Sequence, residues 1–91
     1  METLFSLGRL LATPGALDAA NRAGENLLLF FCRPAAGDWG DLSRDDLSAN
    51  DEALKEGTRL LSAYHLKDGT KIWIITEWDR SVSTALLPEE Y

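Results

Sequence analysis

The sequence predicts an α+β fold, with a three- to four-stranded antiparallel sheet and two or three short helices on one face. Three observations lead to this expectation. The last third of the chain is rich in β-branched and aromatic residues, which favour strands. Helix-capping residues mark the ends of expected helices in the first two thirds. The length of the chain suits one domain. With 45% hydrophobic and 26% charged residues, the 91-residue chain has ordinary globular usage, so we expect a single small domain over residues 1–91.

The first third of the chain is expected to hold a strand and then a helix. Residues 3–13 place leucines and a phenylalanine around Gly8, which suits a short, bulged strand better than a helix. Thr13 and Pro14 match the N-cap and first position of a helix that would end at Gly24.

The apolar run "LLLFFC" begins after Asn26, a candidate helix cap, and precedes the loop "PAAGDWGD". Periodicity cannot separate a buried strand from a buried helical turn in so short a run. We favour a short helix over residues 27–33, because the run follows another helix in a chain too small to enclose a central parallel strand. Cys32, the single cysteine, is expected to be buried as a small hydrophobic residue.

Residues 43–56, "SRDDLSANDEALKE", favour a surface helix that Ser43 caps and Gly57 closes. The clearest region is an antiparallel meander from about residue 58 to residue 87. There "RLLSAYHL" and "TKIWIITEW" flank the hairpin loop "KDG", and "DRS" turns the chain into "VSTALL".

The middle strand of this meander is apolar on both sides, because Ile72 and Ile74 alternate with Trp73 and Ile75. A helical layer would cover one side. The other side would be covered by the chain itself or by a second copy, so the pattern leaves a homodimer open.

Charge and composition exclude several classes of function. Fifteen acidic against nine basic residues give a net charge of −6, which repels phosphate backbones and argues against direct binding to nucleic acid. The N-terminal stretch carries Glu2 before its apolar residues and is too short to span a membrane, so we expect a cytoplasmic protein without a membrane partner. No phosphate-binding loop or HExxH motif occurs, and we expect no cofactor.

Catalytic chemistry has few candidate residues. His65 is the only imidazole that could activate a nucleophile, and we expect it to pack or to face solvent. The acids between residues 38 and 56 suggest a small metal-dependent hydrolase as an alternative, since hard divalent ions take carboxylate ligands. A solvated acidic helix face explains the same residues, so catalytic and metal-binding residues are assigned as none.

The expected activity is binding to another protein. The turn that follows the middle strand holds Glu77, Trp78, Asp79 and Arg80, where either carboxylate would pair with Arg80 or the turn would contact a partner. Trp39 either anchors its own loop or meets a partner. The candidate partner-binding residues are Trp39, Asp41, Asp45, Asp46, Asp51, Glu52, Trp78, Asp79 and Arg80. A second alternative is an inhibitor of a defence nuclease, such as a restriction or CRISPR enzyme, whose acidic helix imitates a phosphate backbone.

The segments "LSAYHLKDGTKIWIITEWDRSVSTALLPEEY", "GDWGDL", "NDEALKEG" and "ATPGAL" extend over much of the chain. Through them the chain resembles a group of small bacterial proteins of plasmids and integrative elements, described as plasmid-related proteins or as type I restriction endonuclease subunits. This resemblance implies a compact accessory product of mobile DNA. It implies no activity and no catalytic residue.

Overall fold

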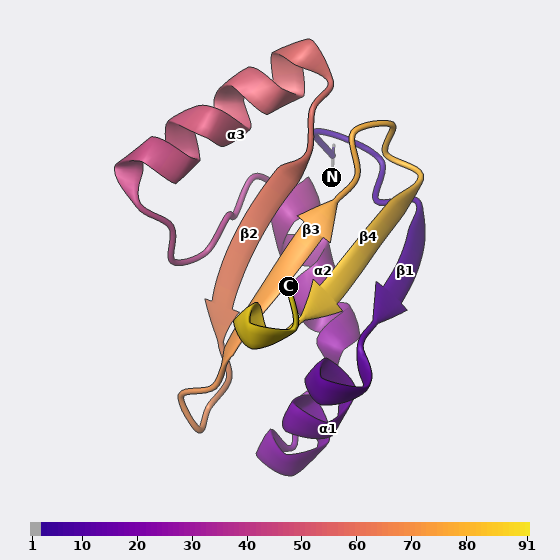
Figure 1. The fold of residues 1–91 in the computed structure, drawn as a ribbon, viewed down its shortest axis with the longest axis vertical. Coiled ribbons are helices and arrows are strands. Elements are labelled where there is room, and N and C mark those ends of the chain that lie inside the picture. Colours follow the sequence, from indigo (N-terminus) through magenta and orange to yellow (C-terminus); the bar gives the residue numbers. More distant parts are fainter. Residues whose placement is uncertain (1–2) are drawn as a thin grey trace.

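The computed structural model describes residues 3–91, so Glu2 lies outside the described residues. The chain order is β1 (Arg9–Ala12), α1 (Pro14–Ala23), α2 (Leu27–Ala35), α3 (Arg44–Glu56), β2 (Leu60–His65), β3 (Lys71–Thr76), β4 (Val82–Leu86) and a 3₁₀ turn at Pro88–Glu90. Figure 1 shows the strands side by side, with α3 outside the β2 edge. The α+β class is confirmed.

The helix boundaries follow the predicted caps. The side chains of Thr13, Asn26 and Ser43 accept hydrogen bonds from the first backbone N–H groups of α1, α2 and α3. Gly24 and Gly57 end α1 and α3 in the left-handed conformation. The helical assignment of the "LLLFFC" run is confirmed, and α2 extends through Pro34 to Ala35, which we had placed in the following loop.

The sheet order is β1-β4-β3-β2. Strands β2, β3 and β4 form the predicted antiparallel meander, with Ser62 opposite Ile74 and Ile74 opposite Ala85. The expectation of a purely antiparallel sheet is wrong, because β1 pairs with β4 in parallel. A parallel pair needs a long crossover, and here the three helices together with β2 and β3 provide it.

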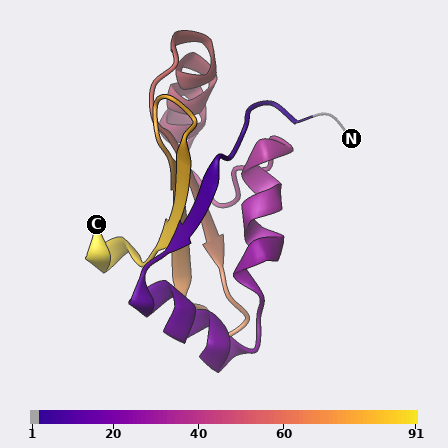
Figure 2. The same ribbon diagram turned by 90° about the vertical axis from the view of Figure 1, so that its right-hand side faces the viewer.

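The main core lies between one face of the sheet and the pair α1 and α2. Ile72, Ile74 and Tyr64 from the sheet pack there with Phe30 and Phe31 from α2. Figure 2, which looks along the sheet, shows α2 on this side and the C-terminal turn on the other. The expected position of all helices on one face needs correction, since α3 is attached at the β2 edge, where Asn50 binds the backbone of Leu61.

The opposite face of the sheet is covered in part by the chain's own C-terminus. The ring of Tyr91 meets Trp73 edge-on, with 5.9 Å between ring centroids, and the guanidinium of Arg59 lies over Tyr91. Trp73 is half-buried. The chain's own C-terminus therefore covers part of the side of β3 that faces away from the helices.

Cys32 corrects another expectation, because it is exposed. The helical period of α2 turns Leu27, Phe30 and Phe31 toward the sheet and leaves Leu28, Leu29 and Cys32 on the outer side. The cysteine thiol lies 3.5 Å from the carbonyl oxygen of Leu28. Burial statistics for cysteine mispredicted this residue because the rotation of the helix, and not the residue type, decides its side.

Candidate protein-binding surfaces

The acidic residues proposed to meet a partner are exposed. Asp45 and Asp46 lie in the first turn of α3, where the helix dipole favours carboxylates, and Asp51 and Glu52 lie in its middle. No ion pair among residues 3–91 includes an acidic residue of α3. The helix α3 therefore presents exposed carboxylates that can meet a basic surface.

The β3–β4 turn brings Trp78 to the surface near the C-terminal end of α3. The side chain of Trp78 is 65% exposed. Asp79 accepts hydrogen bonds from the backbone N–H and the hydroxyl of Ser81, and the Ser81 hydroxyl is the largest cause of its lowered pKa. Asp79 thus closes the turn locally, and Trp78 is the apolar group that the turn offers.

Arg80 fixes this turn to the end of α3. Its Nη1 donates to the carbonyl oxygens of Thr58, over 2.6 Å, and Glu77, over 3.0 Å, while Nη2 donates to Ala53 O over 3.0 Å. The expected ion pair with Glu77 or Asp79 does not form, because the guanidinium donates instead to three backbone carbonyl groups, one in α3, one just after it and one in the turn itself. Arg80 therefore positions the turn that carries Trp78.

Trp39 and Asp41 take different positions. Trp39 is buried and stacks on Phe5 with their rings nearly parallel, at 5.9 Å between centroids, so it anchors its loop. Asp41 is exposed, and its Oδ2 lies 3.6 Å from Nδ1 of His65. Trp39 is connected to the Trp78 turn through Phe5, because the Arg80 guanidinium lies over the Phe5 ring. No described contact brings Asp41 to that turn.

The residues considered for catalysis lie apart from one another. Among residues 3–91, no three His, Cys, Asp or Glu side chains lie close enough together to hold a metal ion. His65 is exposed, and no serine, threonine or cysteine side chain in the same range makes a hydrogen bond to it. The acidic stretch is thus extended along a helix and not gathered around a centre.

A polar network that the sequence did not reveal links α2 to β2. Arg33 donates to Asp38 over 2.7 Å, and this hydrogen bond is the largest cause of the lowered pKa of Asp38. The guanidinium also lies over the ring of Tyr64, whose hydroxyl donates to the Asp38 carbonyl oxygen over 2.6 Å. Burial raises the pKa of Tyr64 to about 12. Tyr64 is 26 residues away from Asp38, so no local motif could have indicated its place in the network.

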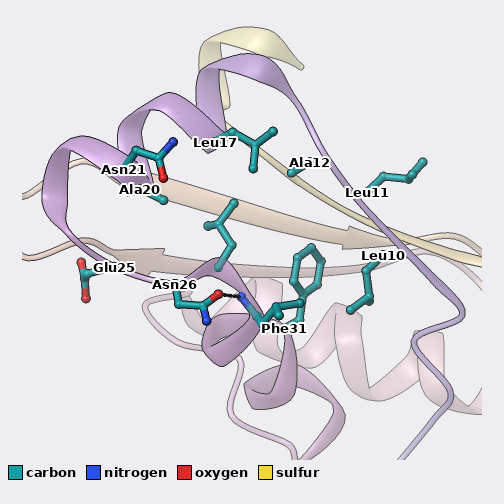
Figure 3. Close-up of a pocket in the computed structure, with 11 residues that line it drawn as sticks. Leu10, Leu11, Ala12, Leu17, Ala20, Asn21, Glu25, Asn26 and Phe31 are labelled. Carbon is teal, nitrogen blue, oxygen red and sulfur yellow. Dashed lines mark hydrogen bonds between the residues drawn. The ribbon is translucent and has the colours of Figure 1, made fainter.

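The second surface missed by sequence reasoning is a groove beside β1, which we call the β1 groove. It has a volume of about 510 Å³ and lies between β1, α1 and α2. Figure 3 shows Leu10 pointing toward Phe31, and Leu17 above them on α1. The exposed fractions are 39% for Leu10, 51% for Leu17 and 57% for Leu28. Exposed leucines around one groove are typical of an association surface.

The fold and these surfaces define a small α+β protein that exposes one acidic helix and one apolar groove. No helix in the described chain is long and apolar enough to cross a membrane. No family model, no curated protein and no solved structure matches the chain.

Proposed function

We propose that this chain is a noncatalytic cytoplasmic accessory protein that binds a partner protein with a basic surface. The binding surface consists of the exposed carboxylates of α3, Asp45, Asp46, Asp51 and Glu52, together with Trp78. The resemblance to proteins of plasmids and integrative elements suggests the same accessory role in mobile DNA.

One observation carries this proposal: Arg80 ties the Trp78 turn to the C-terminal end of the acidic helix. An exposed tryptophan supplies a large apolar contact, and carboxylates beside it steer a basic partner toward it. Their combination on a rigid support is typical of protein interfaces, in which an aromatic anchor is surrounded by charged residues.

The test compares paired variants in affinity capture from a host extract. Trp78→Ala and the double variant Asp51→Asn/Glu52→Gln should each weaken capture of the same partner by roughly tenfold. The matched control is Asp18→Asn/Glu89→Gln, which removes two exposed carboxylates elsewhere and should capture normally. Binding should also weaken as the salt concentration rises. Equal capture by all variants would contradict the proposal.

A sharper alternative is inhibition of a defence nuclease through imitation of nucleic acid. The exposed carboxylates of α3, which form no ion pair within residues 3–91, favour it, because a protein groove that binds phosphates would also attract them. The wild-type chain should then reduce cleavage by a restriction or CRISPR nuclease. Neutralising Asp45, Asp46, Asp51 and Glu52 together should restore cleavage, and unchanged inhibition by that variant would rule the alternative out.

A further inference from the structure

The two edges of the sheet differ in a way that concerns self-association. At the β2 edge, Leu61 is paired with the Asn50 side chain, and Ala63 with the backbone of Trp39 and Asp41. At the β1 edge, only the β4 side is paired. The N–H groups of Arg9 and Thr13 donate to Ser81 and Ala85 of the β4 side. In a parallel strand, successive residues direct their backbone N–H and C=O groups alternately toward one neighbouring strand and the other. Since Arg9 and Thr13 face β4, Leu10 and Ala12 direct their N–H and C=O groups outward.

We propose that the β1 edge binds the β1 edge of a second copy of this chain, in antiparallel orientation, and so forms a homodimer with one continuous sheet. A two-fold rotation centred on Leu11 brings the outward N–H and C=O groups of one copy opposite those of the other. Leu10 of one copy then exchanges hydrogen bonds with Ala12 of the other, and the two Leu11 side chains meet across the axis.

The same register brings opposite charges together. It places Arg9 across from Thr13 of the second copy. The Thr13 hydroxyl donates to Oε1 of Glu90 over 2.5 Å, so the Glu90 carboxylate lies beside this position. Arg9 therefore faces a carboxylate of the other copy, and the two-fold axis produces this pair twice.

The distribution of charge favours a second copy of this chain, and not an unrelated strand, as the partner at the β1 edge. The chain has a net charge of −6, yet the only charged residue that lines the β1 groove is Glu25. The Glu25 carboxylate accepts the backbone N–H of Lys67. The acidic helix α3 lies at the other end of the strand order, beyond β2 (Figure 1). Joining two copies at β1 thus keeps their acidic helices at the far ends of the combined sheet, where their repulsion is weakest.

The blocked β2 edge also determines how far association proceeds. A sheet that is open at both edges can add copies without limit, whereas a chain with one open edge stops at two. The exposed leucines of the β1 groove, which include Leu10, Leu17 and Leu28, would be covered by the same contact. The structure accordingly favours a closed dimer over a filament.

The experiment is sedimentation velocity on the full chain at several concentrations. Wild type should reach twice the 10.1 kDa mass of one chain. Leu11→Asp places two carboxylates at the axis and should weaken self-association by about a hundredfold or more, because like charges are costly at an interface. The matched control is Leu29→Asp, at a leucine that is 70% exposed on α2 and does not line the groove, and it should remain dimeric.

Circular dichroism would verify that Leu11→Asp is folded. If it is not, Arg9→Glu provides the second test, since it removes the pair with Glu90 and should also weaken the dimer. In wild type, the amide protons of Leu10 and Ala12 should become protected from hydrogen exchange as the concentration rises. A monomeric wild type, a dimeric Leu11→Asp variant, or exchange at Leu10 and Ala12 that does not depend on concentration would overturn the proposal. None of these outcomes depends on the partner bound through α3.

Discussion

The side-chain amide of Asn50 pairs with both backbone groups of Leu61: Nδ2 donates to the carbonyl oxygen over 2.7 Å, and Oδ1 accepts the N–H over 3.1 Å. A residue of a helix thereby takes the place of a neighbouring strand. Asn50 is buried, and its amide attaches α3 to the sheet while it blocks the β2 edge.

Replacing Asn50 should therefore both destabilise the fold and expose the edge. Asn50→Ala leaves the N–H and C=O of Leu61 without partners in a partly buried position, and we expect a loss of about 2 kcal/mol in the free energy of unfolding. Urea denaturation would measure it. Ser48→Ala, at an exposed position of α3, is the control and should change stability by less than about 0.5 kcal/mol. Association beyond a dimer should appear only for Asn50→Ala, and equal stability of the two variants would contradict this role.

Gly8 has a positive φ of 67° and lies against the backbone that follows Arg80. A side chain at this position would overlap the carbonyl oxygen of Ser81, which the N–H of Arg9 also binds. Gly8→Ala should cost about 1–3 kcal/mol more than Gly24→Ala, because Gly24 has a similar φ of 69° with no atom near the added carbon. Urea unfolding of both variants separates the steric overlap from the cost of the left-handed backbone. Equal losses would show that β1 has room to shift.

Arg80 is the one residue other than glycine among residues 3–91 with a positive φ, at 61°. Its hydrogen bonds to carbonyl groups hold it there, so Arg80→Ala should destabilise the chain by about 2–3 kcal/mol. Arg80→Gly loses the same bonds but relieves the backbone, and should recover about 1 kcal/mol of that loss. Arg22→Ala, on the exposed face of α1, should change little. If glycine and alanine are equally destabilising, the backbone at this position carries no strain.

The buried Tyr64 predicts a fall in stability at alkaline pH. Burial raises the pKa of its hydroxyl from 10.0 to about 12. Between these values the unfolded chain releases the tyrosine proton and the folded chain keeps it. The contribution of Tyr64 to the free energy of unfolding is therefore fully present below pH 10. Above pH 10 this contribution decreases, by up to about 1.4 kcal/mol for each pH unit, until about pH 12.

The measurement is the free energy of unfolding between pH 9 and about pH 12, in a Tyr91→Phe background that leaves Tyr64 as the single tyrosine. Adding Tyr64→Phe should remove the contribution of Tyr64 to this pH dependence. It should also cost about 1 kcal/mol below pH 10, since the hydrogen bond to Asp38 is lost. The same slope with and without Tyr64 would show that another group is responsible.

Several local features could be predicted because they depend on near neighbours in the sequence. Thr13 and Ser43 cap their helices through groups three residues away, and the hairpin before Lys71 follows from the loop "KDG". The role of Asn50 was missed, although there was a signal for it. It lies three residues after Leu47 and four before Leu54, in the middle of the apolar stripe of α3.

The candidate site was predictable only in part. The exposed carboxylates of α3 and the exposed Trp78 follow from local polarity and turn chemistry. Arg80 was expected to pair with a carboxylate, but carbonyl oxygens of Ala53 and Thr58 surround it instead. Those groups come from a different element, and sequence spacing contains no information on that approach.

The α+β class, the N-terminal caps of the helices and the antiparallel meander follow from local sequence signals, because capping bonds, turn geometry and side-chain alternation act over a few residues. The folded chain adds that β1 joins β4 in parallel, that Cys32 faces outward, and that one sheet edge is blocked while the other is open. The physical reason is that each of these depends on contacts between segments distant in the chain, and these contacts form only when the whole core packs together.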